Sequence, residues 1–197
     1  MGCAVTDGRF SLAALVLASI TAFALVLARC DRAPEGAAGD DAAVVDTQLL
    51  AFLSLARSHH HEATILEQSG DKRGAIDALR KITTAPKPHD GEKLPEVEEV
   101  VADAYARIAD LEVETNDTSN ARKDVETGLR HAPDPTYFRG HLLEVYGVVE
   151  QTRASQLADA GQDAAAAEAN AHAVTLLRQA VDVQEGVIGR ALDGGAK

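Results

Sequence analysis

The run Ser-His-His-His-Glu at positions 58–62 brings several potential metal ligands together in this sequence. A zinc site needs three or four ligands that converge on one ion. Consecutive residues of a helix point about 100° apart, so only His59 and Glu62, three positions apart, share a face. His59 and Glu62 are therefore candidate ligands that would need a further partner from elsewhere. We expect the chain to bind no metal and no cofactor.

No catalytic motif is complete in this sequence. His61 and Glu62 begin an HExxH pattern, but Ile65 stands where that motif has its second histidine. The sequence has no phosphate-binding loop, dinucleotide-binding glycine motif or GxSxG elbow. Cys3 and Cys30 both precede residue 31, so the rest of the chain has no thiol nucleophile. We expect a protein that is not an enzyme. The remaining histidines are isolated, as structural or surface histidines usually are: His89, His131, His141 and His172.

The chain is acidic, with 31 Asp and Glu against 19 Lys and Arg and a net charge of -12. Such a surface repels phosphate backbones, so we expect no nucleic-acid partner. Ala, Leu, Glu, Asp and Arg are abundant, and alternating strand patterns are missing. The composition therefore favours helices throughout.

The N-terminal segment carries a membrane signal. Residues 10–28 form an uncharged run long enough to span a bilayer as a helix. Residues 1–30 are therefore predicted to be a transmembrane anchor or a signal peptide, and residues 31–45, rich in Ala, Gly, Asp and Pro, a flexible linker.

Two acylation patterns accompany this segment. Leu27-Ala28-Arg29-Cys30 resembles a bacterial lipoprotein box with Cys30 as the lipidated residue, although Arg29 replaces the small residue of that motif. The start, MGCAVT, fits an N-myristoylation pattern. We expect a membrane-associated protein on the extracytoplasmic or periplasmic side of a bacterial cell envelope.

Apolar residues recur at three- and four-residue steps over residues 46–193, which predicts amphipathic helices. The helix-ending signals Gly70, Asn116 and Gly161 lie 46 and 45 residues apart, and an aspartate that can cap the next helix follows each of them. Residues 46–193 are thus predicted to form an all-α domain of three consecutive antiparallel helical hairpins.

The last predicted helix has features of its own. Asp163 is expected to cap it, and Gly186 and Gly189 predict fraying or a bend near its end. Its alanine-rich stripe alternates three- and four-residue steps, close to a coiled-coil seam, and would permit self-association. The stripe comprises Ala166, Ala169, Ala173, Leu176, Ala180, Val183 and Val187.

The runs GDKRGAIDALRKITTAP, from Gly70, and NDTSNARKDVETGLRHAP, from Asn116, follow one order of residues. They resemble the second helix of the tetratricopeptide-repeat family, which typically starts with Gly-Asp and continues with a small residue, large apolar positions and a terminal proline. Ala75 and Ala121 stand at the small position, and Pro133 at the terminal one. The period exceeds the family's about 34 residues. A closed bundle of the same six helices therefore stays an alternative to a solenoid.

The resemblance implies that the first helix of each hairpin lines a concave groove that binds another protein. The groove positions that it implies are Arg57, His60, Thr64, Glu67, Asp103, Asp110, Gln151 and Ser155. The expected function is that of a membrane-tethered, non-catalytic scaffold in a bacterial envelope assembly. The alternative is a helical bundle that binds a small ligand or metal in its core near His59, His60 and Glu62.

Overall fold

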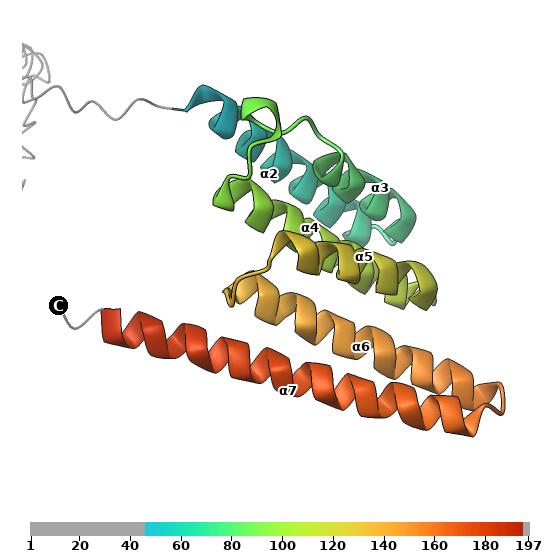
Figure 1. Cartoon of the computed structure of the whole chain (residues 1–197). Helices are drawn as coiled ribbons and strands as arrows, with labels where there is room; N and C mark the ends of the chain where they lie inside the picture. The colour runs from blue at the N-terminus through green and yellow to red at the C-terminus, as the bar shows by residue number, and fades with distance from the viewer. Residues whose placement is uncertain (1–45, 195–197) are drawn as a thin grey trace, which may run out of the picture. The chain divides into compact units, whose positions relative to one another are not determined.

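The computed structural model describes residues 46–194, and over this range it contains helices and no strand. This confirms the predicted all-α class. The helices are α2 (Thr47–Gln68), α3 (Lys72–Thr83), α4 (Pro95–Glu114), α5 (Thr118–His131), α6 (Tyr137–Asp159) and α7 (Asp163–Gly194), with the short 3-10 helix η1 (His89–Gly91) before α4 (Figure 1).

The predicted membrane segment 10–28, the lipidation candidate Cys30 and the linker 31–45 lie outside the described residues. Between residues 46 and 194, no helix combines the length and the apolar character needed to cross a bilayer.

The three hairpin turns lie where the sequence predicts them. Gly70, Asn116 and Gly161 have backbone φ angles of 85°, 63° and 71°. This left-handed conformation ends a helix and is easiest for glycine and asparagine. The carboxylate of Asp71 accepts a hydrogen bond from the Gly74 amide at 2.9 Å, and that of Asp117 accepts one from Asn120 at 3.2 Å. Two of the three predicted caps are therefore confirmed.

The expectations for the last helix were wrong in two details. Asp163 lies inside the first turn of α7, and the preceding residue Gln162 accepts the first helical hydrogen bond, from the Ala166 amide at 2.9 Å. The helix also continues through Gly186 and Gly189 to Gly194. A glycine costs a helix only about 1 kcal/mol, which the regular residues around it offset.

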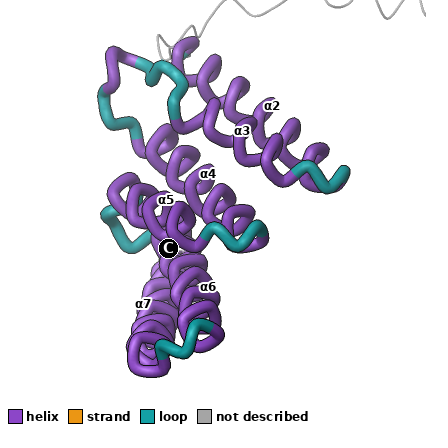
Figure 2. Tube along the Cα trace, turned by 90° about the vertical axis from the view of Figure 1, so that its right-hand side faces the viewer, coloured by secondary structure: helices purple, strands orange, loops and turns teal. Residues whose placement is uncertain are grey.

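The hairpins stack in chain order. The two helices of each hairpin pack together, and α2 packs on α4 as α4 packs on α6. Figure 2 shows the three hairpins as successive layers, with α2 and α3 at one end and α6 and α7 at the other. Because α2 does not pack against α7, residues 46–194 form an open stack, and the alternative of a closed bundle is not formed.

Helix α4 belongs to two apolar cores. Its residues Val101 and Ile108 pack with α2 and α3, while Ala102, Ala106 and Ala109 pack with α5 and α6. Alanines at these positions let the helices approach closely. The central hairpin therefore holds the outer two together through α4.

The alanine-rich stripe of α7 faces α6. Ala166, Ala169, Ala173 and Ala180 are buried, and the fit is close, because a Cβ added at Gly147 of α6 would lie 2.7 Å from Cγ of Leu177. This stripe is thus occupied within the chain. Self-association stays a prediction, and it would need another surface.

Candidate functional site

The predicted groove residues lie on the first helices α2, α4 and α6 of the three hairpins. We call the surface formed by these residues together with Arg107, His141 and Glu144 the first-helix face. On α2, Arg57, His60 and Thr64 line one open hollow of about 580 Å³, together with Ser58 and His61. The hollow is wide enough for side chains of a bound segment.

Arg107 of α4, which sequence reasoning missed, connects α4 to α2. Its guanidinium donates to Oε2 of Glu67 at 3.0 Å, and it lies 3.3 Å from Nδ1 of His60 and 3.5 Å from the Thr64 hydroxyl. Three residues predicted for the groove on α2 thus meet at one arginine. An alternation of charge on α4, Asp103 before Arg107 before Asp110, was the signal in the sequence.

His60 lies between Arg107 and a carboxylate. Its Nε2 is 3.8 Å from Oδ2 of Asp103. Burial lowers the pKa of His60, and the charge of Arg107 lowers it further, while Asp103 opposes both. His60 is therefore neutral near neutral pH, with Nδ1 available as the acceptor for Arg107.

Asp110 is the point where carboxylates of three helices come together. Burial raises the pKa of Asp110, and the charges of Glu114 on α4, Glu144 on α6 and Glu67 on α2 raise it further, against His141. Like charges around a partly buried carboxyl disfavour its ionised form. Glu67 is paired with Arg107 and Glu114 with Lys72 at 2.9 Å, whereas Asp110 and Glu144 form no ion pair with another of residues 46–194. The centre of the first-helix face therefore has an excess of negative charge at Asp110 and Glu144.

The two predicted residues on α6 lie further along the same helix. Gln151 and Ser155 are exposed, and the Ser155 hydroxyl donates to the Gln151 carbonyl at 3.3 Å. Seven and eleven positions separate them from Glu144, so helical periodicity places all three on one face. Val148, exposed to 38%, lies between them and adds an apolar contact surface.

The histidine cluster diverges, as the helix geometry predicted. His59 Nδ1 is 2.9 Å from Oε2 of Glu62, and Lys81 of α3 donates to Oε1 of the same carboxylate at 3.2 Å. His60 faces Arg107 instead, and His61 is exposed. Residues 46–194 contain no group of three potential ligands that could hold a metal ion.

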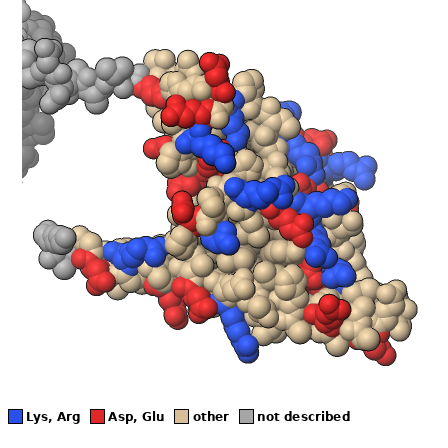
Figure 3. Space-filling view, viewed as in Figure 1, with Lys and Arg blue, Asp and Glu red and all other residues tan. Residues whose placement is uncertain are grey.

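Basic residues gather on the second helices, where Figure 3 shows Lys and Arg side chains over α3 and α5. Many of them reach acids of the first helices. Arg80 of α3 donates to Glu112 of α4 at 2.7 Å and to Asp124 of α5 at 2.8 Å. Burial raises the pKa of Glu112 to about 8, and Asp124 adds to the shift.

A second buried glutamate, Glu150 of α6, lies beside two arginines and a histidine. Arg153 donates to its Oε2 at 2.9 Å, and His172 of α7 and Arg122 of α5 lie 3.6 Å from its two oxygens. Sequence reasoning missed both buried glutamates, whose contacts with arginines connect neighbouring hairpins. Their only signal in the sequence is that each directly follows an apolar residue of the core, Leu111 before Glu112 and Val149 before Glu150.

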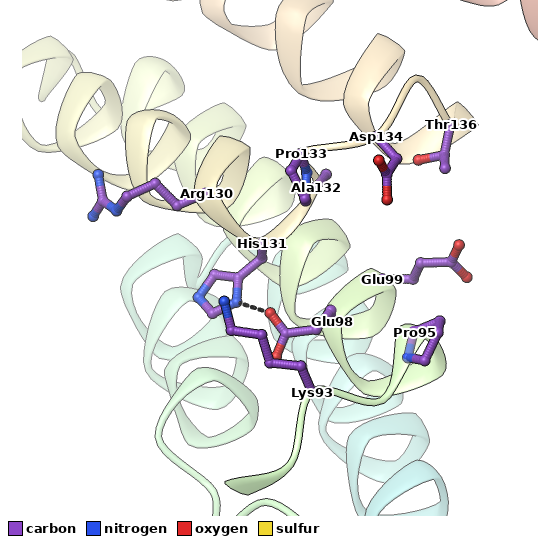
Figure 4. Close-up of a pocket in the computed structure, with 10 residues that line it drawn as sticks. All are labelled: Lys93, Pro95, Glu98, Glu99, Arg130, His131, Ala132, Pro133, Asp134 and Thr136. Carbon is purple, nitrogen blue, oxygen red and sulfur yellow. Dashed lines mark hydrogen bonds and ion pairs between the residues drawn. The ribbon is translucent and has the colours of Figure 1, made fainter.

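A hollow of about 240 Å³ lies where the start of α4 meets the end of α5 (Figure 4). Within it, His131 Nδ1 is 2.6 Å from Oε2 of Glu98, and Lys87, which does not line the hollow, donates to Oε1 of Glu98 at 2.9 Å. Burial alone raises the pKa of Glu98, but Lys87 and His131 together hold it below its ordinary value. Both carboxylate oxygens are occupied, so this hollow acts as a joint between helices.

The isolated histidines of the sequence are thus paired in the fold. Besides His131, His89 lies 2.7 Å from Asp46, which fixes the loop before α4 to the start of α2. His141 stacks on Tyr137, with ring centroids 6.1 Å apart. Such contacts support structural roles.

Comparisons of the chain with protein-family models, with curated protein sequences and with solved structures give no match. The resemblance to the tetratricopeptide-repeat family stays a prediction.

Proposed function

We propose that residues 46–194 are a non-catalytic scaffold that binds a protein partner across the first-helix face. In this proposal residues 10–28 tether the scaffold to the membrane on the extracytoplasmic side of a bacterial envelope. The open stack of hairpins supports the proposal, because it leaves one face of α2, α4 and α6 uncovered along three layers. An extended surface of this kind suits a protein segment.

The observation that carries the proposal is the cluster of carboxylates around Asp110. Acids from three helices raise the pKa of this partly buried group and His141 opposes them, while Asp110 and Glu144 themselves form no ion pair within residues 46–194. A lysine or arginine from a partner would relieve the repulsion, and the acidity of the chain would speed its association with a basic partner. We therefore expect the bound segment to be cationic.

The alternative, a small ligand or metal near His59, His60 and Glu62, is less well supported. Glu62 is already paired with His59 and Lys81, and His60 with Arg107. These three side chains therefore already have partners within the fold, and they do not converge on one position where a ligand or metal ion could bind.

The test is capture of partners by the full chain, crosslinked in membranes of the native cell and then extracted with a mild detergent. Asp110→Asn combined with Glu144→Gln removes two central carboxylates. The matched control, Asp77→Asn with Glu92→Gln, removes two exposed carboxylates outside the face.

We expect proteins with a basic segment to be captured by the unmodified chain and the control and lost with the Asp110 and Glu144 variant. Affinity of the purified pair should fall about tenfold, the effect of one or two desolvated charge contacts. Equal capture by all three chains would contradict the proposal.

A further inference from the structure

Helix α7 exposes a second apolar row beside the one that faces α6. Val174, Leu177, Val181 and Ile188 are exposed to 47%, 37%, 52% and 58%. Together with Gln184, these residues recur at alternating steps of three and four positions. Each of them directly follows a residue of the alanine-rich stripe that faces α6. This is the spacing of a coiled-coil seam.

Within residues 46–194, α6 contacts only the edge of this outer row, at Leu177 and Gln184, and Val174, Val181 and Ile188 stay about half exposed. Helix α7 is the last layer of the stack and runs on past the start of α6 (Figure 1). Val174, Leu177 and Val181 line a shallow hollow of about 290 Å³ with Arg178 and Asp182 at its edges. Contiguous exposed apolar surface of this kind marks an interaction site.

The charges beside the row indicate what covers it. Arg178 and Glu185 are one heptad apart on the same flank, both exposed, and neither forms an ion pair with another residue of the 46–194 range. A pair of identical surfaces must be self-complementary. Two antiparallel copies of α7, related by a twofold axis beside Val181 and Asp182, would set each Arg178 opposite the other copy's Glu185.

A parallel pair would not use these charges. In parallel coiled coils the flank that carries Arg178 meets positions on the opposite flank of the partner. Those positions here are Ala173 and Ala180, which are uncharged and face α6. The charge pattern therefore selects the antiparallel arrangement.

We propose that two copies of this chain associate through the outer row of α7, antiparallel, with Arg178 of each paired to Glu185 of the other. This surface is separate from the carboxylates around Asp110, and the inference does not depend on the proposed function.

The first test is sedimentation equilibrium of the full chain in a mild detergent over a concentration series. Val181→Glu places a charge in the centre of the row and should raise the dimer dissociation constant at least about tenfold. Ile65→Glu is the matched control, since Ile65 on α2 is equally exposed, at 54%, but lies outside the row. We expect the control to dimerise as the unmodified chain does. A chain that is monomeric throughout, or a dimer that Val181→Glu leaves unchanged, would overturn the proposal.

The second test exchanges the charges and leaves the apolar row intact. Arg178→Glu or Glu185→Arg alone should weaken the dimer several-fold, because like charges then face each other twice. The double variant restores opposite charges and should regain the original dissociation constant. If the double variant is as weak as either single one, the antiparallel pairing is wrong.

Discussion

The buried carboxyl of Glu112 predicts a specific dependence of stability on pH. The side chain is 5% exposed, and burial followed by Asp124 raises its pKa from 4.5 to about 8. Between these two values the folded chain holds a proton that the unfolded chain has released. The free energy of unfolding contributed by this group is therefore greatest below about pH 4.5 and falls as the pH rises through about 8.

The size of the effect follows from the shift. Within the window each pH unit changes the free energy of unfolding by about 1.4 kcal/mol per proton. Between about pH 6 and about pH 8 the unmodified chain should therefore lose about 2 to 3 kcal/mol and then level off. Glu112→Gln keeps the shape and an acceptor for Arg80 but cannot titrate, so this loss should disappear.

The measurement is urea unfolding of the full chain in a non-ionic detergent, followed by far-ultraviolet circular dichroism from about pH 6 to about pH 9. Glu114→Gln is the control. Glu114 lies two positions away, is 49% exposed and pairs with Lys72 at 2.9 Å. It should keep the pH dependence of the unmodified chain.

The reasoning fails if Glu112 is ionised and paired with Arg80 at neutral pH. In that case Glu112→Gln would cost about 3 to 5 kcal/mol at pH 7, as breaking a buried ion pair does. The unmodified chain would then show no loss of stability between about pH 6 and about pH 8.

Other predictions concern packing and the first-helix face. Gly128→Ala would place a Cβ 2.6 Å from Cδ2 of Leu142 and should lower the free energy of urea unfolding by about 1 to 3 kcal/mol. Gly189→Ala meets no atom within 4 Å and should raise the same free energy by about 0.5 to 1 kcal/mol, so a loss there would show that the end of α7 is not helical. Arg107→Gln removes a positive charge beside His60, and NMR titration should find the pKa of His60 higher than in the unmodified chain. An unchanged pKa would mean that the two side chains do not meet in solution.

The helices and turns were predictable because their signals are local. Gly70 and Asn116 end helices through their own tolerance of positive φ, and Asp71 and Asp117 bond amides only three residues away. Spacing between such signals predicts hairpins. Asp163 shows the limit of this reasoning, because a cap can shift by one residue when a neighbour such as Gln162 serves equally well.

The charged contacts were not predictable for the opposite reason. Glu112 meets Arg80 from 32 positions away, and Arg107 meets Glu67 from 40. These pairs depend on how α4 is rotated against α2 and α3, and hydrophobic periodicity defines that rotation only to within a residue or so. In the sequence, Glu112 looks like an ordinary charged residue of a solvated helix, and the charge alternation around Arg107 does not say which residue of α2 it contacts.

The sharing of α4 between two cores has a consequence for how the chain responds to a pull. The core of α2, α3 and α4 can open while that of α4 to α7 stays packed, since no other helix belongs to both. Load applied through residues 1–45 enters at α2 and reaches the first hairpin before the others. Under tension this hairpin should unfold in one step and lengthen the chain. Helices α4 and α6, which carry Asp110 and Glu144, should stay folded.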